Sequence, residues 1–329
     1  MGEFELIRRF FTRATPKAVL GVGDDCAILQ PGPGMQMAIS TDMLVEGRHF
    51  FPDVDPRSLG HKALAVNLSD LAACGARPLA FTLALALPRV DEAWLQAFSE
   101  GLMALADAHG CELIGGDTTR GPLTICITVF GEMPATQALL RSGAQPGDDI
   151  YVSGTLGDAS LALAALQGRV TLPPEWLAFA RPRLERPTPR IALGLALRGV
   201  ASAAADVSDG LLGDLGHILD RSGVGASVDT KDAIYLIAVY AYSTRAGGHF
   251  DTYVSAQLAR QCVLAGGDDY ELVFTAAPAQ RAAVQAASNA SATPVTRIGQ
   301  IEAAPGLRLL DGQGNVLAHS FASFDHFAT

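Results

Sequence analysis

The feature that most constrains the fold is a repeated change of apolar period along residues 35–134. Short segments that alternate or are uniformly apolar, as strands do, are separated by two longer segments with apolar residues at helical spacing. Gly75 and Pro88 end two of these segments. We therefore predict an α/β domain, with a short helix over 3–11, strands over 35–41, 79–87, 111–116 and 123–133, and helices over 55–76 and 91–110.

The second half of the chain has the same kind of alternation. Strands are expected over 150–154, 271–277, 295–301 and 307–311, and helices over 156–168, 186–199 and 211–223. Because 329 residues are long for one domain and polar turn residues gather at 141–149, we predict two α/β domains, 1–140 and 141–329. The span 234–261 fits neither period and carries no prediction.

Glycine and aspartate recur together in four clusters: GVGDDCA (21–27), GGDTTRG (115–121), DVSDG (206–210) and GGDDYE (266–271). The first looks like a phosphate-binding loop, in which glycines let the backbone approach a phosphate. Phosphate loops usually end in a lysine, yet the chain has only Lys17, Lys62 and Lys231, and none of them follows a glycine. This excludes a Walker A sequence.

The acidic clusters tend to follow a hydrophobic stretch or a glycine turn, and strand ends are where α/β domains bind ligands. Residues expected at such ends are Ser40, Thr41, Asp42, Asp117, Asp206 and Asp209. Asp70 lies instead within an apolar predicted helix, where a carboxylate needs a partner. Carboxylates with hydroxyl neighbours suit Mg²⁺. We predict that magnesium supplies the positive charge that a lysine supplies elsewhere, so that the protein binds ATP through metals.

Several of these residues have simpler interpretations. A lone Gly-Asp is usually a turn, and Asp-x-x-Asp at a helix start is usually a cap. Asp148 and Asp149 are interpreted as turn acids, and three histidines as helix-surface or core residues: His61, His109 and His217. Arg141 fits either a solvated loop position or a phosphate contact.

Composition narrows the class of protein. With 24 basic and 34 acidic residues, the net charge of −10 gives no overall attraction to nucleic acid or to an anionic membrane. The five cysteines contain no C-x-x-C pair, which argues against a zinc ribbon and a disulfide framework. No apolar signal core begins the chain, and the apolar stretch 79–87 is too short to span a bilayer. We expect a cytoplasmic enzyme.

Taken together, the motifs resemble those of thiamine-monophosphate kinases. The matching segments are GVGDDCAIL, ISTDMLVEGRHF, NLSDLAACGARP, LIGGDTTRGPL, DVSDGLLGDLGHI, GGDDYELVF and the terminal FDHFAT. A single GGD is a weak signal, but the set is in consistent order from Gly2 to Thr329. The wider superfamily includes aminoimidazole ribonucleotide synthetase, selenophosphate synthetase and the hydrogenase maturation protein HypE.

The resemblance implies two α/β domains, a homodimer through the N-terminal domains, and ATP near their interface. The implied reaction is direct in-line phosphoryl transfer from ATP to thiamine monophosphate, with several Mg²⁺ ions. The implied magnesium environment is Asp25, Ser40, Thr41, Asp42, Asp70, Asp117, Asp206 and Asp209, of which Asp42 and Asp209 are the catalytic residues. The implied nucleotide contacts are Gly116, Asp117, Arg141 and Ser208, and the implied substrate contacts are His49, Asp268 and Phe324.

Two positions depart from the family pattern. The family motif usually reads Gly-Gly-Glu-Asp-Tyr-Glu, so Asp268 replaces a glutamate with a shorter side chain. Phe324 stands where tyrosine is frequent, and it keeps the ring for stacking on a cationic heterocycle but lacks the hydroxyl. Two alternatives stay open: a sister ATP-dependent enzyme of the superfamily and a non-catalytic sensor of Mg·ATP.

Overall fold

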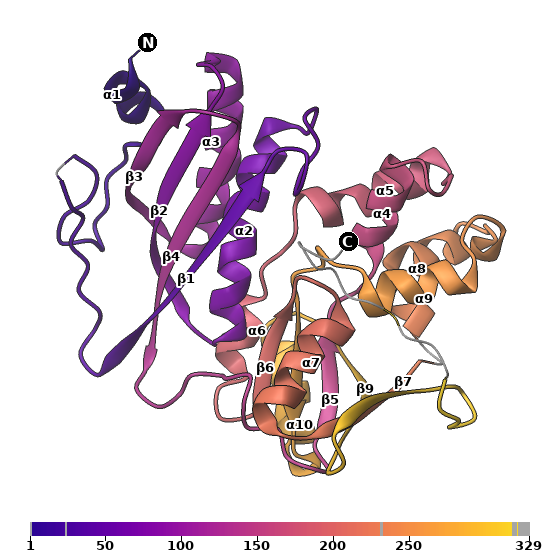
Figure 1. Cartoon of the computed structure of the whole chain (residues 1–329). Helices are drawn as coiled ribbons and strands as arrows, with labels where there is room; N and C mark the ends of the chain where they lie inside the picture. Colours follow the sequence, from indigo (N-terminus) through magenta and orange to yellow (C-terminus); the bar gives the residue numbers. More distant parts are fainter. Residues whose placement is uncertain (1, 24, 231–232, 318–320, 322–329) are drawn as a thin grey trace. The chain divides into compact units, whose positions relative to one another are not determined.

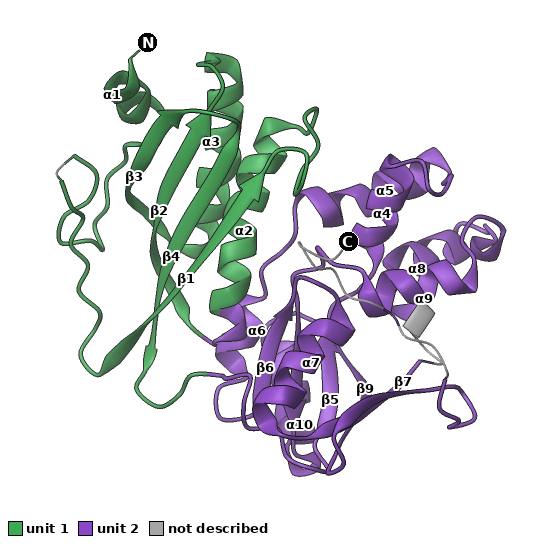
Figure 2. Ribbon diagram, viewed as in Figure 1, with its two compact units in different colours: residues 1–71, 76–138 green, residues 72–75, 139–329 purple. Residues whose placement is uncertain are grey.

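The computed structural model describes residues 2–23, 25–230, 233–317 and 321, and the chain forms two compact units (Figures 1 and 2). Unit 1 comprises residues 1–71 and 76–138, and unit 2 comprises residues 72–75 and 139–329. Each unit contains a sheet and helices, which confirms the predicted two-domain α/β class. Within the described part of the chain, no helix is long and apolar enough to cross a membrane.

Unit 1 contains a four-stranded sheet and two long helices. Its elements are α1 (Glu3–Leu6), the π-helix η1 (Ile7–Phe11), β1 (Met35–Val45), α2 (Pro56–Ala73), β2 (Arg77–Leu87), α3 (Glu92–His109), β3 (Glu112–Arg120) and β4 (Thr124–Pro134). The strand order is β1-β4-β2-β3, with β2 and β3 parallel and β4 antiparallel to both of its neighbours. The predicted order of strands and helices is confirmed, but β1 and β3 both continue past their predicted ends.

Local interactions explain where α3 begins and where both long helices end. The side chain of Asp91 accepts a hydrogen bond from the backbone N–H of Trp94 (3.1 Å), which caps the start of α3. Gly110 follows α3 in the left-handed conformation (φ 58°), and Gly75 adopts a similar conformation after α2 (φ 66°). Both glycine stops were predicted from the sequence.

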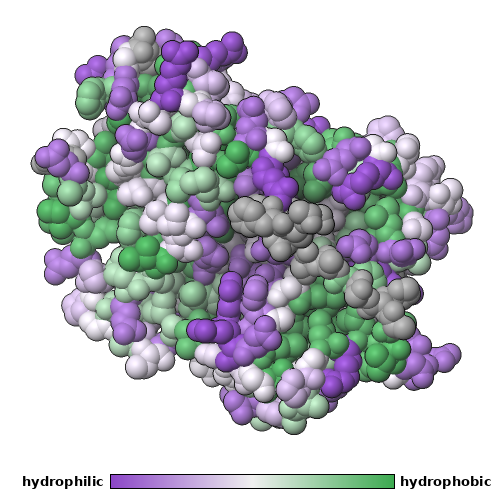
Figure 3. Space-filling model, viewed as in Figure 1, coloured by the Kyte–Doolittle hydropathy of each residue, from purple (hydrophilic) through white to green (hydrophobic). Residues whose placement is uncertain are grey.

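The two faces of the unit 1 sheet have different surroundings. The helices α2 and α3 lie along one face of the sheet (Figure 1). Leu44 and Ile127 are buried, and the register places them on the same face as Ser40, which bonds to α2. On the other face, Ile39 and Met43 expose 62% and 54% of their surface, and Figure 3 shows apolar side chains at the surface over unit 1. Cross-strand register places the following residues together on what we call the open face: Ile39, Thr41, Met43, Cys126, Thr128, Thr82, Ala84 and Asp117.

Unit 2 contains a six-stranded sheet in the order β10-β7-β9-β5-β8-β6, in which only β10 and β7 are a parallel pair. Its strands are β5 (Asp149–Ser153), β6 (Ala203–Val207), β7 (Gly225–Asp229), β8 (Glu271–Ala276), β9 (Val295–Glu302) and β10 (Gly306–Leu310). Its helices are α4 (Asp158–Leu166), α5 (Pro174–Glu185), α6 (Ile191–Ala196), α7 (Leu211–Ser222), η2 (Ala233–Leu236), α8 (Ala238–Arg245), η3 (Phe250–Thr252), α9 (Ala256–Ala265), η4 (Pro278–Gln280) and α10 (Arg281–Ala290).

Most predicted elements of unit 2 are present, although α6 is shorter than expected because prolines precede it. The elements β7, α5 and α10 carried no prediction. The span 234–261 consists of short helical pieces, η2, α8, η3 and part of α9, which explains why no single period is visible there.

Asp149 is not the turn acid that the sequence suggested, whereas Asp148 does close a turn, since its backbone N–H donates to the carbonyl oxygen of Gln145 (3.0 Å). Asp149 is the first residue of β5 and is fully buried, and its carboxylate accepts hydrogen bonds from Arg281 (2.6 and 2.9 Å) and Arg297 (3.0 Å). Asp148 is also buried and accepts a hydrogen bond from the hydroxyl of Ser202 (2.6 Å). Both carboxylates therefore stabilise unit 2, because each is buried with its hydrogen-bond partners in place.

Candidate functional site

The first group of predicted residues lies between β1 and α2. Ser40 and Asp42 are inside β1 rather than at its end, so the expected position at a strand terminus is wrong; the strand continues to Val45. The hydroxyl of Ser40 donates to the carboxylate of Asp70, and the side-chain oxygen of Asn67 accepts the backbone N–H of Asp42 (3.0 Å). Asn67 and Asp70 are three residues apart on α2 and therefore share one face of the helix. This face brings two carboxylates and a hydroxyl together.

Thr41 and His49 are placed differently. Thr41 points to the open face, where its hydroxyl lies 2.8 Å from that of Thr128. His49 follows β1, and its Nδ1 accepts the backbone N–H of Val45 at 3.0 Å. Because Nδ1 is an acceptor, the neutral ring carries its proton on Nε2. Lys62 donates from Nζ to the carbonyl oxygen of His49 at 3.4 Å.

The second group lines a cavity in unit 1. Asp25, Gly116 and Asp117 are among the residues around this space of about 620 Å³, and Glu3, Phe4, Ile7 and Phe11 of the N-terminal helices form another part of its wall. This volume is within the usual range for small-molecule sites. Asp117 lies within β3, so its predicted position at a strand end is also wrong.

The backbone at Gly116 permits no side chain. Gly116 has a φ of 149°, and a Cβ atom there would lie 1.9 Å from the carbonyl oxygen of Leu83 on the neighbouring strand β2. Glycine is therefore required for the pairing of β2 and β3. The same glycine exposes backbone at the wall of the cavity, as a close approach by a phosphate would need.

The third group lies in unit 2, where β6 leads into α7. Asp206 is the fourth residue of the five-residue β6, close to the strand end as predicted, and Ser208 and Asp209 follow the strand. The buried carboxylate of Asp214 on α7 accepts the backbone N–H groups of Ser208 (3.0 Å) and Asp209 (3.1 Å). These two hydrogen bonds fix the backbone conformation of the DVSDG loop.

Burial, and next the nearby charge of Asp209, raise the pKa of Asp214 to about 7, although the two backbone hydrogen bonds and Arg141 act in the opposite direction. The charge of Arg141 therefore affects the pKa of Asp214, although the Arg141 side chain is exposed. The phosphate contact of Arg141 stays a prediction.

The GGDDYE segment lies beside the DVSDG loop. The backbone N–H of Asp268 donates to the carbonyl oxygen of Ser208 (2.9 Å), and that of Tyr270 donates to the carbonyl oxygen of Val207 (2.8 Å). The hydroxyl of Tyr270 also reaches the carboxylate of Asp268 at 3.4 Å. A predicted substrate residue and a predicted nucleotide residue are thus joined through the main chain.

Within unit 1 the predicted residues form two groups, one between β1 and α2 and one at the cavity, and unit 2 carries the third. Among the described residues, no three His, Cys, Asp or Glu side chains are arranged to hold a metal ion by themselves. Phe324 lies outside the described residues. Sequence reasoning missed Asn67 and Asp214; the helical spacing of Asn67 from Asp70 was the available signal for the first, and the acid four residues after Gly210 was the signal for the second.

Comparisons with known proteins cover both units. Residues 23–133 match the family model "AIR synthase related protein, N-terminal domain", and residues 145–312 match the corresponding C-terminal domain. A thiamine-monophosphate kinase of Salmonella typhimurium (strain LT2) is 49% identical over an alignment of 333 positions, which covers 100% of this chain and 99% of that protein.

Comparison with solved structures points to the same family of proteins. The crystal structure of a thiamine-monophosphate kinase from Stenotrophomonas maltophilia K279a is 46% identical, with a TM-score of 0.81 over 95% of this chain and 96% of that one. A structure described as AaThiL complexed with AMPPCP and TMP is 27% identical, with a TM-score of 0.74 over 91% of this chain and 89% of that one.

Proposed function

This chain belongs to the thiamine-monophosphate kinase family, and we propose that it transfers the terminal phosphoryl group of ATP to thiamine monophosphate, giving ADP and thiamine diphosphate. The observation that carries this assignment is the 49% identity to a thiamine-monophosphate kinase over the full length of both chains. The AaThiL complex adds that AMPPCP and TMP are bound together by a protein of this fold.

Unit 1 supplies the first part of the nucleotide site in this proposal. The cavity beside β3 is large enough for a nucleotide and has Asp25, Gly116 and Asp117 in its wall. Unit 2 supplies the other nucleotide contacts in this proposal, Arg141 and Ser208 of the DVSDG loop. Arginine suits this role because its planar fork of donors matches the geometry of a phosphate.

Magnesium fits the donor set of these residues. The eight proposed ligands offer only carboxylate and hydroxyl oxygens: Asp25, Ser40, Thr41, Asp42, Asp70, Asp117, Asp206 and Asp209. Mg²⁺ usually keeps several waters and shares one or two carboxylates with substrate phosphates, so separate small groups of acids suit it better than a closed cage. When bound, the metal neutralises phosphate charge and so lowers the repulsion between two anionic substrates.

The residues of the chain then need mainly to position the two phosphates. The attacking oxygen of thiamine monophosphate is already ionised near neutral pH, so no strong general base is required. His49 and Asp268 orient the substrate in this proposal, and Asp42 and Asp209 would hold magnesium, which would supply positive charge to the phosphates. We propose in-line transfer without a phosphoenzyme, in which the phosphate oxygen of thiamine monophosphate attacks the terminal phosphorus of ATP and ADP leaves.

A homodimer through the open face is part of the same proposal. Ile39 and Met43 are largely exposed on that face, and pairing with a second copy would remove their apolar surface from water. Exposed apolar side chains on the flat surface of a sheet also suit a partner with the same surface. We place the enzyme in the cytoplasm, where its nucleotide substrate is made.

The test follows ADP and thiamine diphosphate together, with Mg·ATP present and thiamine monophosphate present or absent. We expect equal amounts of both products, and only when magnesium and thiamine monophosphate are both present. ADP without thiamine diphosphate would indicate a sister enzyme of the superfamily. Nucleotide binding with no ADP would indicate a sensor.

A further inference from the structure

The segment that carries Asp268 has an unusual backbone. Asp268 and Tyr270 both adopt left-handed conformations, with φ values of 68° and 50°. Residues with a side chain rarely adopt this region, and a bulky residue such as tyrosine is disfavoured there. Such a conformation persists only where the surroundings hold it in place. Asp268 is a proposed substrate contact, so whatever holds this backbone also sets the direction of its carboxylate.

The residues between and after these two point inward. Asp269 and Glu271 are both fully buried, whereas Asp268 and Tyr270 are partly exposed. The carboxylate of Asp269 accepts the backbone N–H of Gly157 through both oxygens (3.0 and 2.9 Å). The segment is therefore attached on its inner side to the turn that follows β5.

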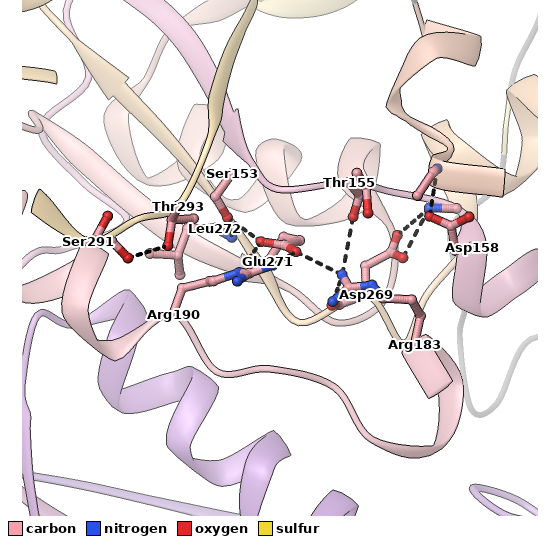
Figure 4. A network of polar contacts seen from close by, with 12 residues as sticks. Ser153, Thr155, Asp158, Arg183, Arg190, Asp269, Glu271, Leu272, Ser291 and Thr293 are labelled. Carbon is pink, nitrogen blue, oxygen red and sulfur yellow. Dashed lines mark hydrogen bonds and ion pairs between the residues drawn. The ribbon is translucent and has the colours of Figure 1, made fainter. Parts of the chain in front are cut away.

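Arg183 of α5 connects the same two pieces of chain (Figure 4). Its terminal nitrogen donates to the carbonyl oxygens of Thr155 and Asp269, each at 3.2 Å, and to the carboxylate of Glu271 at 2.7 Å. One guanidinium thus contacts the turn, the backbone between Asp268 and Tyr270, and the buried acid at the start of β8.

Arg190 shares only one of these contacts, the one with the Glu271 carboxylate. It donates to both oxygens of the Glu271 carboxylate, from Nε at 2.6 Å and from a terminal nitrogen, and the hydroxyl of Ser153 donates to the same carboxylate at 2.5 Å. No hydrogen bond from Arg190 to the backbone of residues 266–271 is present among the described contacts. Arg190 and Arg183 therefore share one charge partner but differ in their contact with the Asp268 segment.

Compensation of the Glu271 charge does not by itself explain the placement of Arg183. Within the described residues, Nε of Arg183 is buried and has no hydrogen-bond partner. A buried donor without a partner is unfavourable. The side chain instead uses one nitrogen for three acceptors, two of which are backbone carbonyls of the segments that flank it.

We infer that Arg183 is a positioning residue for the substrate site: it fixes the backbone on which Asp268 is mounted and so directs the Asp268 carboxylate toward thiamine monophosphate. The inference rests on the proposed function for the identity of the ligand. The contacts that carry it lie entirely within unit 2.

The experiment compares Arg183→Gln with the matched variant Arg190→Gln, using the full chain. We expect Arg183→Gln to raise KM for thiamine monophosphate about tenfold, with KM for ATP changed less than about twofold. Arg190→Gln lowers the unfolding temperature to a similar extent but leaves both KM values near those of the unchanged protein. Arg183→Lys keeps the charge without the fork of donors, and we expect it to recover stability but only part of the substrate affinity.

A second readout does not depend on turnover. Hydrogen exchange of the backbone over residues 266–272 is expected to be faster in Arg183→Gln than in Arg190→Gln. Equal exchange in the two variants, or equal changes in KM for both substrates, would overturn the inference. If the unchanged protein forms no thiamine diphosphate, the proposed function fails, while the exchange measurement still decides whether Arg183 holds the segment.

Discussion

Asp42 and Asp117 lie on opposite faces and at opposite edges of the same four-stranded sheet. Asp42 is on β1 and shares its face with Leu44 and Ile127, while Asp117 is on β3 and shares the open face with Ala84. Two strands separate them, so three strand spacings of about 4.8 Å give a separation of about 14 Å across the sheet. One ion cannot contact both carboxylates of one chain, and the proposed magnesium environment therefore consists of more than one site.

Asp42→Asn tests the metal role of the β1 and α2 group. We expect kcat to fall by about a hundredfold or more, because a ligand to the phosphate-binding metal is weakened. The unfolding temperature is expected to change by less than about 2 °C, since the hydrogen bond to the Asn67 side-chain oxygen is donated by the backbone N–H of residue 42 and not by its side chain. Steady-state kinetics over a magnesium titration and thermal unfolding measure the two effects.

The matched control for this variant is Asp220→Asn, which removes a carboxylate from an exposed position on α7. Its kinetics and its magnesium dependence are expected to equal those of the unchanged protein. Near-normal turnover by Asp42→Asn would count against the metal assignment.

Gly116→Ala tests the close approach of β3 to β2. The new Cβ would meet the Leu83 carbonyl oxygen at 1.9 Å, and alanine disfavours a φ of 149°. We expect the free energy of unfolding to fall by about 3 kcal/mol or more from strain and displacement of the strand. Gly216→Ala is the control, because a Cβ at that helical position has no atom within 4 Å and alanine favours a helix. If urea unfolding gave the same loss of unfolding free energy for both variants, the close approach of Gly116 to Leu83 would not be the cause of that loss.

The ion pairs of Asp149 predict a dependence of stability on pH. Hydrogen bonds from Arg281, and next those from Arg297, lower the pKa of Asp149 below its usual range, although burial opposes them. A lowered pKa in the folded state means that the contribution is complete above the ordinary value of about 4 and is lost as the pH falls through the folded value. Both arginines are about half exposed, so we expect Asp149→Asn to lower the free energy of unfolding at pH 7 by only about 1–2 kcal/mol.

The measurement for Asp149 is the difference in unfolding free energy between the unchanged protein and Asp149→Asn at several pH values. This difference should be constant from about pH 7 to pH 5 and should shrink below about pH 4. A difference that stays constant to the lowest pH at which the protein folds would mean that the ionised form of Asp149 is not what stabilises β5.

Ile39→Asp tests whether the open face joins two copies. An aspartate in the centre of an apolar interface must be desolvated without a partner, so we expect the variant to be monomeric at micromolar concentrations, where we expect the unchanged protein to be dimeric. Val90→Asp is the control, since Val90 is similarly exposed (47%) but belongs to the loop after β2. Light scattering during gel filtration measures the mass, and a dimeric Ile39→Asp would exclude the open face.

The sequence predicted the elements of unit 1 well because long periodic segments and glycine stops give strong local signals. It placed Ser40, Asp42 and Asp117 wrongly, because nothing local marks where a strand stops being paired; β1 and β3 continue through their acidic residues. The family motifs could be recognised despite this error, because recognition depends on the residue types and their order. Which face each carboxylate takes depends on strand register, and that becomes visible only in the folded sheet.

Structural carboxylates were the hardest to separate from functional ones. Asp148, Asp149, Asp269 and Glu271 occur in motifs of the same composition as the proposed ligands, yet all four are buried with partners from distant parts of the chain. Their partners are brought close only by folding. Sequence spacing cannot distinguish an acid that faces a distant arginine from one that faces a ligand.

The two main-chain hydrogen bonds between the DVSDG loop and the GGDDYE segment also have a thermodynamic consequence. If one loop is ordered by nucleotide and the other by thiamine monophosphate, ordering either one reduces the entropy left to lose in the other. Each ligand then raises the affinity for its companion, and linkage requires the two effects to be equal in size. Under the proposed assignment of Ser208 to the nucleotide and Asp268 to the substrate, the pair of bonds at Ser208 and Val207 would couple the two ligands through the backbone.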